Sequence, residues 1–161
     1  MRRCVLLLAA AAVLAACGGT KTVARVGGHE ITQHDVNQMV DFYKVEVEQA
    51  GHELPPKSSD SYHFLEQRLL GLIVYRYELE GAAAKLGVHL SDAEVEAQLK
   101  RNKTVQKEGE NGPHRAYIEN ATRIDLIEGK VGAKLGPSAA LEWVETQPKK
   151  ISVEYEEGWG P

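Results

Sequence analysis

The first residues that could bind a metal in a close pattern are His29, Glu30 and His34, in the run HEITQH. Two histidines that bind one zinc ion from a single helix lie four residues apart, because that spacing places both on one face. Here the spacing is five residues, and Thr32, a residue type that caps helices, lies in the middle of the run. The remaining histidines are scattered singly along the chain. We therefore predict no metal site and no cofactor.

Other patterns that carry catalysis are weak in this chain. The acidic residues are spread as pairs along what should be solvated helix faces, which explains them better than a pair of catalytic carboxylates does. No glycine-rich phosphate loop follows a strand, and the serines of residues 58–61 lie in a polar linker. We predict that the protein is not an enzyme. A hydrolase with a dispersed site would leave no motif and stays an open alternative.

The reactive side chain with the clearest context is Cys17. Arg2 and Arg3 precede a short run rich in Ala, Val and Leu, and the small residues Ala15 and Ala16 lead directly to Cys17. A cationic start, an apolar core and small residues at the end are typical of a secretory signal peptide. The apolar run is too short to span the ~30 Å hydrocarbon core of a bilayer as a helix.

The sequence Leu14-Ala15-Ala16-Cys17 resembles a bacterial lipobox. This resemblance implies that residues 1–16 are removed and that Cys17 becomes the first residue and carries the lipid, palmitate included. Residues 17–22 would form a flexible polar tether, and residues 23–161 the folded domain. The protein would then be extracytoplasmic and anchored to a bacterial membrane by its lipid. An ordinary signal peptide with a chance cysteine is the alternative.

Composition limits the classes of partner. Loss of Arg2 and Arg3 with the signal would leave 17 basic against 23 acidic residues, a formal net charge of −6. An acidic domain without clustered Lys and Arg is not expected to bind nucleic acid. Cys17 would be the only cysteine left, so the fold must be held by packing and not by an internal disulfide.

The hydrophobic pattern predicts a mainly α-helical domain. Residues 23–26 and 29–31 form a strand hairpin around Gly27-Gly28, and residues 151–155 alternate like a half-buried strand. We expect these strands to share one small antiparallel sheet that joins the two ends of the chain. Five helices are predicted between them, at about residues 33–49, 61–86, 92–103, 114–135 and 139–147, with caps at Thr32, Ser91 and Ser138.

The order of these elements resembles the chaperone domain of the SurA, PrsA and trigger-factor group. The resemblance covers roughly residues 23–160 and is carried by three stretches: VARVGGHEIT at 23–32, the long helix FLEQRLLGLIVYRYELEGAAAKL at 64–86, and GVHLSDAEV at 87–95. It implies a five-helix chaperone module. Many relatives carry a parvulin-type prolyl isomerase domain before the last helix, where this chain has only Gly136-Pro137. We therefore predict no isomerase activity.

Apolar residues beside the main helical stripes are the candidate binding surface. Met39 and Phe42 lie beside the stripe of the first helix, and Tyr77 lies off the main stripe of the second. Burial in the core is the default explanation, whereas a groove that binds unfolded chains is the explanation that the family resemblance favours. Met and aromatic side chains suit varied partners.

Two classes of function remain. The first is a lipid-anchored, ATP-independent chaperone, or holdase, that binds unfolded or partly folded secreted proteins. The second is a structural or adaptor lipoprotein that uses the same fold for one fixed protein partner, or for a second copy of itself as a homodimer. Promiscuity separates them, because only a chaperone should suppress aggregation of unrelated proteins.

Overall fold

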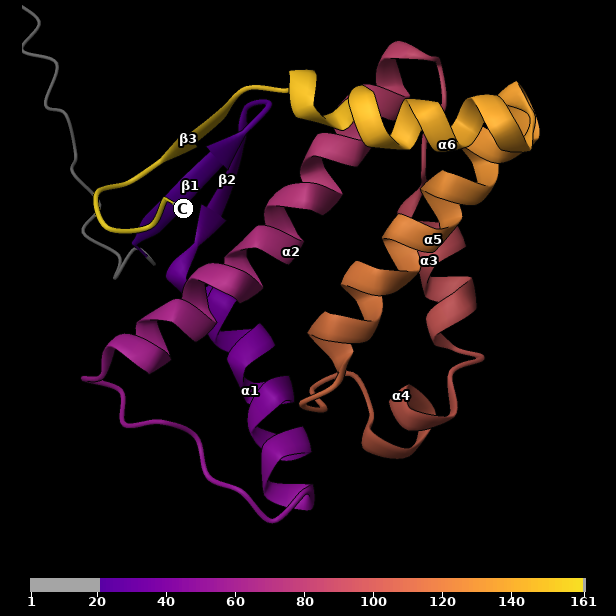
Figure 1. Cartoon of the computed structure of the whole chain (residues 1–161). Helices are drawn as coiled ribbons and strands as arrows, with labels where there is room; N and C mark the ends of the chain where they lie inside the picture. Colours follow the sequence, from indigo (N-terminus) through magenta and orange to yellow (C-terminus); the bar gives the residue numbers. More distant parts are fainter. Residues whose placement is uncertain (1–20, 161) are drawn as a thin grey trace, which may run out of the picture.

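A computed structural model describes residues 21–160. Cys17, the proposed signal and most of the proposed tether lie outside these residues. The elements follow in this order: β1 (Thr22–Val26), β2 (His29–Thr32), α1 (Gln33–Gln49), α2 (Asp60–Lys85), α3 (Asp92–Leu99), α4 (Lys103–Glu108), α5 (Arg115–Leu135), α6 (Pro137–Thr146), a 3-10 turn (Pro148–Lys150) and β3 (Val153–Tyr155). The fold is mainly helical, as predicted (Figure 1).

The three strands form one antiparallel sheet in the order β2-β1-β3. Gly27 and Gly28 both have positive φ, which a tight hairpin between β1 and β2 requires. Arg25 on β1 pairs with Glu30 on β2 and with Glu154 on β3, so the first strand is the central one. The prediction that the sheet joins the two ends of the chain is confirmed.

Helix α2 runs through the middle of the molecule, with the sheet on one side and α5 on the other (Figure 1). Its buried residues therefore do not form one stripe. Leu70 and Val74, beside its main apolar stripe, are buried in the core, whereas Leu72 is exposed. Both positions follow from the packing of α2 on several sides.

Side-chain caps fix where the helices begin. Thr32 accepts a hydrogen bond from the Asp35 backbone N–H, and the Asp35 carboxylate accepts one from the Thr32 N–H. Ser91 and Glu94 form the same capping box at α3. Both caps confirm the prediction, and each satisfies backbone donors that the first turn of a helix leaves free.

The prediction of five helices was one too few. The third helix was expected to reach residue 103, but α3 ends at Leu99. A separate short helix, α4, starts after Asn102, whose side chain accepts hydrogen bonds from the Thr104 and Val105 N–H groups. The proposed cap at Ser138 was also wrong. Gly136, at φ +83°, precedes Pro137, which is the first residue of α6. Proline is favoured at the first position of a helix, because a backbone N–H there would have no partner within the helix.

The far half of α1 leaves the core. Among its apolar residues, Val36 and Val40 are buried, whereas Tyr43 and Ala50 are exposed. Within residues 21–160, no helix has the length and apolar character needed to cross a membrane.

Candidate functional site

A cleft lies between α1 and α5, and we call it the interhelical cleft. Its outer part is a cavity of about 430 Å³ that is bordered by α1, the loop before α5, and α5 itself. The α1 residues that line it are His34, Gln38 and Asp41. The outer part of the cleft therefore lies between the first and fifth helices of the fold.

The inner part of the interhelical cleft is a smaller cavity of about 170 Å³. Gln38, Ala116 and Glu119 border both parts, so the two cavities adjoin each other. Helix α2 supplies the floor of the inner part through Ile73, and α2 also contributes polar groups there.

Four carboxylates border the interhelical cleft, together with the guanidinium groups of Arg76 and Arg115. Asp35 and Asp41 of α1, Glu110 of the loop and Glu119 of α5 all border it. Charged side chains keep such a hollow hydrated, while Met39, Ile73 and Tyr77 give its inner part an apolar share.

Met39 and Tyr77 are brought together, since both line the inner cavity. Met39 is only 2% exposed and belongs to the hydrophobic core. Tyr77 is half-buried and stacks on His29 of β2, with ring centroids 4.9 Å apart. These two candidate residues therefore form the boundary between the core and the cleft.

Phe42 lies elsewhere and joins α1 to α5. Its ring stacks on Tyr117 with centroids 3.9 Å apart and meets the edge of His114. The His114 ring in turn contacts the carboxylates of Glu108 at 2.7 Å and Glu46 at 3.1 Å. Phe42 therefore holds α1 and α5 at a fixed separation, which sets the width of the cleft, and does not line the cavity.

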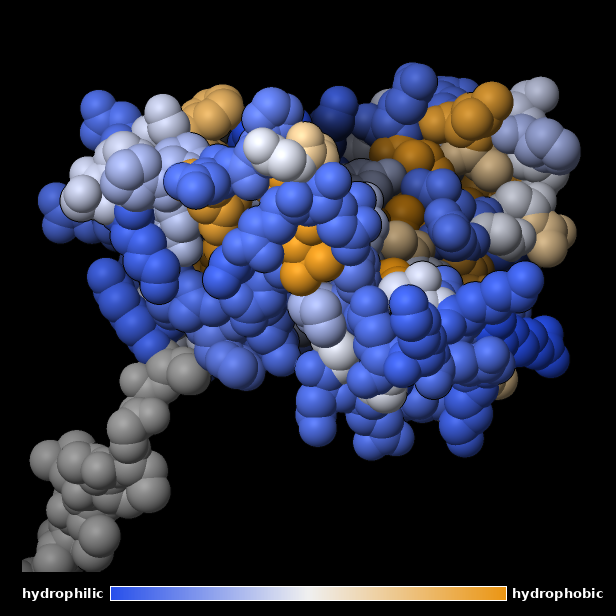
Figure 2. Space-filling model, turned by 90° about the horizontal axis from the view of Figure 1, so that it is seen from below, coloured by the Kyte–Doolittle hydropathy of each residue, from blue (hydrophilic) through white to orange (hydrophobic). Residues whose placement is uncertain are grey.

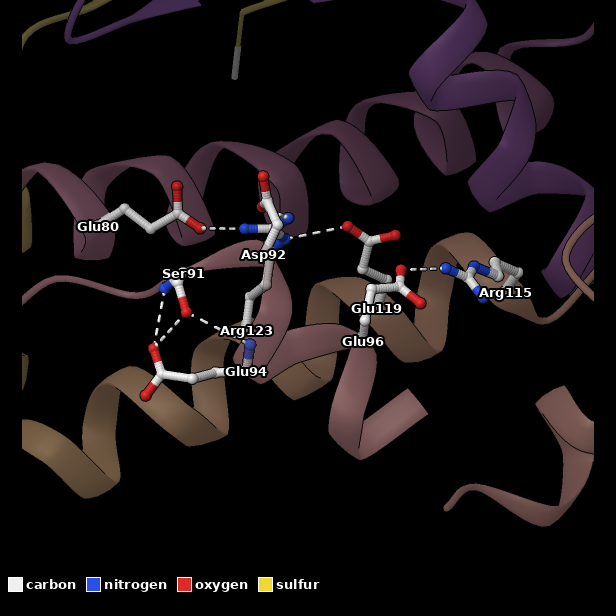
Figure 3. A network of polar contacts seen from close by, with 8 residues as sticks. All are labelled: Glu80, Ser91, Asp92, Glu94, Glu96, Arg115, Glu119 and Arg123. Carbon is white, nitrogen blue, oxygen red and sulfur yellow. Dashed lines mark hydrogen bonds and ion pairs between the residues drawn. The ribbon is translucent and has the colours of Figure 1, made fainter. Parts of the chain in front are cut away.

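Ion pairs hold α5 to the other side of the molecule (Figure 3). Arg123 on α5 contacts Asp92 at 2.7 Å, Glu119 at 3.0 Å and Glu80 of α2 at 3.7 Å. Glu119 is thus both a rim residue of the cleft and a partner of Arg123. The network therefore ties α5, which forms one side of the cleft, to α2 and α3.

Two polar residues in the inner cavity were not among the predicted site residues. Arg76 interrupts the apolar stripe of α2, which is the one sequence signal that could have identified it. Asn120, on α5, is only 6% exposed. Nothing in the sequence distinguishes Asn120 from a surface asparagine, because its burial depends on how α5 packs.

A second hollow lies at the far end of α1, and we call it the distal groove. It measures about 450 Å³ and is bordered mainly by Tyr43, Val47, Ala50, Leu54 and Pro55. Seen from below, hydrophobic residues form separate small areas among hydrophilic ones (Figure 2). The exposed apolar residues of α1 thus border a hollow instead of covering the core.

Residues 21–160 contain no group of three or more His, Cys, Asp or Glu side chains placed to hold a metal ion. A family model described as SurA-like N-terminal domain matches residues 4–117, which include α1, α2 and the start of α5. No curated protein and no solved structure matches the chain.

Proposed function

The chain belongs to the SurA-like N-terminal domain family, a chaperone-like family, and from that premise we propose that it is an ATP-independent holdase. It would bind unfolded or partly folded secreted polypeptides and keep them from aggregating. The observation that supports this most is that α1 borders two hollows with apolar residues in them, the interhelical cleft and the distal groove.

The proposed mechanism is transient burial of apolar side chains. An unfolded chain exposes apolar groups, and each buried Val, Leu or Phe contributes ~1.5–3 kcal/mol when it leaves water. Tyr43, at 39% exposure, gives the distal groove an aromatic side chain that is already accessible. The carboxylates at the cleft rim keep the loaded complex hydrated. Because the bound chain is released unchanged, no covalent step and no nucleotide are needed.

Anchoring through Cys17 is part of the proposal. The basis is the signal-like sequence that ends at Cys17. Cys17→Ser should leave an uncleaved precursor or release the protein into the soluble fraction. Unchanged membrane association and lipid labelling of that variant would contradict the anchor without affecting the holdase proposal.

Absence of prolyl isomerase activity is also proposed. Gly136 alone separates α5 from α6, and a parvulin domain of tens of residues has no room at that junction. Uncatalysed isomerisation takes tens to hundreds of seconds at 25 °C. The purified protein in catalytic amounts should not accelerate it in a proline-containing peptide, and clear acceleration would contradict the proposal.

The holdase proposal is tested by light scattering of several unrelated proteins as they aggregate after dilution from denaturant. The wild-type protein should suppress scattering at near-stoichiometric ratios for all of them. An adaptor with one fixed partner should suppress none, or only one, and this result would favour the alternative function.

Matched variants locate the binding surface. Gln38 is exposed on α1 and borders both parts of the interhelical cleft, so Gln38→Trp should fill the cleft and weaken suppression. Gln49→Trp makes the same chemical change on the same helix at an exposed position that borders neither hollow. Tyr43→Ser tests the distal groove in the same way. If all three variants suppress aggregation as well as the wild type, neither hollow binds clients.

A further inference from the structure

The distal groove is formed by the last turns of α1 and by the loop that follows this helix. Gly51, at φ +77°, donates its N–H to the Glu48 carbonyl, and the N–H of His52 donates to the Val47 carbonyl. These two hydrogen bonds form a Schellman motif, in which a residue with positive φ ends the helix. Residues 52–55 then border the same hollow as α1, and Figure 1 shows that this end of α1 points away from the sheet.

The apolar part of the distal groove is built into the fold. Tyr43, Val47 and Ala50 lie on one face of α1, because they are four and then three residues apart. Leu54 in the loop packs against the hydrophobic core, so the loop side of the groove is held in place. A cavity of ~150 Å³ holds a benzene-sized group, so a groove of about 450 Å³ has room for several side chains of a short segment.

The charged side chains that border the distal groove are acidic. They are Glu46 and Glu53, and no Lys or Arg of the described residues borders it. The last turn of α1 contains no basic residue that would offset the partial negative charge of a helix C-terminus. Lys44 and Glu48 of α1 pair with each other across 3.8 Å, so together they add no net charge.

Glu53 is the carboxylate that is most available to a partner. Glu46 already contacts the Nε2 of His114 at 3.1 Å. Glu53 is exposed and belongs to no ion pair within residues 21–160. A positive charge beside the groove would therefore be attracted by Glu53 and by the end of α1, whereas a carboxylate in the same place would be repelled by both.

We propose that the distal groove selects client segments in which apolar or aromatic side chains are followed by Lys or Arg, and disfavours segments with Asp or Glu at those positions. The apolar side chains of the client lie against Tyr43, Val47 and Leu54, and its cation lies near Glu53. The inference rests on the proposed function and adds a charge preference to it, because burial of apolar groups alone does not distinguish these segments.

The test uses three end-capped, fluorescently labelled peptides with the same core of Ala, Leu, Phe and Ser, flanked by Lys, Gln or Glu. Binding to the wild type is measured by anisotropy at low salt and at about pH 8, above the ordinary pKa of histidine. The Lys peptide should bind most tightly and the Glu peptide least, with about a fivefold difference, the size expected for exposed charges. The difference should shrink at high salt, because ions screen exposed charges.

Glu53→Lys separates the groove from the net charge of the protein. This variant should lose the preference for the Lys peptide, and Glu53→Gln should lose part of it. Glu145→Lys is the matched control, because it changes the net charge equally at an exposed position of α6 that does not border the groove. The control should keep most of the preference. Equal losses in Glu53→Lys and Glu145→Lys would assign the preference to net charge and overturn the proposal.

Tyr43→Ser tests the apolar contact and the identity of the occupant. It should weaken binding of all three peptides by a similar factor, because Tyr43 meets the core that they share. In sedimentation, a wild-type dimer that Tyr43→Ser dissociates would assign the groove to a second copy of the chain and overturn the proposal. If the wild type binds no peptide and suppresses no aggregation, the proposed function fails. If it suppresses aggregation but binds the three peptides equally or not at all, the charge preference alone fails.

Discussion

Arg123 connects three helices through single side-chain contacts. It is only 17% exposed and faces carboxylates on α2, α3 and its own helix (Figure 3). Isolated exposed ion pairs contribute little, but a half-buried guanidinium with several partners holds them in fixed geometry. The position of α5, and with it one wall of the interhelical cleft, depends on this residue.

Replacing Arg123 with Met should lower the free energy of unfolding by ~1–3 kcal/mol, because Glu80 and Glu119 would keep their half-buried charge without a partner. Urea denaturation measures the change. Arg101→Met is the control, since Arg101 is exposed and belongs to no ion pair among residues 21–160. Equal stability of the two variants would show that the network is not coupled to folding.

Glu94 should make stability depend on acid pH. Hydrogen bonds from Lys130 and from the backbone and hydroxyl of Ser91 lower the pKa of Glu94 from 4.5 to about 2. A carboxyl group with a lowered pKa in the folded state stabilises the fold above its unfolded pKa, and loses this contribution as pH falls through the folded value. The contribution of Glu94 is therefore complete above about pH 4.5 and disappears progressively toward pH 2.

Urea midpoints recorded between pH 6 and pH 3 test this expectation. The midpoint of Glu94→Gln should fall less steeply below pH 4.5 than that of the wild type. Glu145→Gln, which changes an exposed glutamate on α6, should follow the wild type. Parallel curves for all three proteins would contradict the role of Glu94.

Several residue roles could be predicted from the sequence because they depend on local geometry. Thr32 and Ser91 cap their helices through hydrogen bonds to residues three positions later in the chain. Both partners of each cap therefore lie within four consecutive residues of the sequence. Asn102 carries the same kind of signal and was missed as a cap. Within residues 21–160, the Nε of Arg76 and the Oδ1 of Asn120 are buried without a hydrogen-bond partner, which depends on packing between α2 and α5 that no local pattern records.

Among the elements, α2 shows what periodicity can and cannot predict. Its length and ends were predicted closely, since Ser59 caps its start and Leu86 and Gly87 follow its end. Its buried surface was not predicted, because the sheet, α1 and α5 all pack against α2 and together cover more than one stripe of it. A helical period gives the direction of one buried face only when a helix has a single neighbour.

The two glycines inside α2 should respond differently to alanine. A Cβ at Gly71 would meet no atom within 4 Å, so Gly71→Ala should raise stability by ~0.5–1 kcal/mol through helix propensity. A Cβ at Gly81 would lie 3.3 Å from Ile151, so Gly81→Ala should gain less or lose stability. Thermal melts compare the pair, and equal gains would show that Ile151 does not pack on Gly81.

At the scale of the whole molecule, the C-terminal segment completes the core. Pro148, Ile151 and Trp159 are buried, and β3 pairs with β1. This arrangement was predictable because an isolated two-strand hairpin is marginally stable and needs a further strand or a packed helix. The hollows along α1 could not be located from sequence, since they arise from the relative placement of α1, α2, α5 and the loops.

Truncation after Gln147 should therefore destabilise the entire domain. It removes one strand and the buried side chains of Pro148, Ile151 and Trp159. Loss of a buried Ile or Trp side chain costs ~2–5 kcal/mol, in a domain whose total stability is of the order of 5–15 kcal/mol. Calorimetry should show a large fall in melting temperature, whereas full-length Glu157→Ala, an exposed change, should melt like the wild type. An unchanged transition in the truncated chain would mean that the ends fold independently.

The strand order β2-β1-β3 also determines when each edge of β1 can pair during synthesis. During synthesis β1 emerges early and finds its hairpin partner at once, but its other edge waits until the last residues have been made. Until then the chain carries an open strand edge and an uncovered apolar side of α2, the features that cause nascent proteins to associate. A newborn copy of this protein would thus be, for a time, the kind of chain that its mature copies are proposed to shelter.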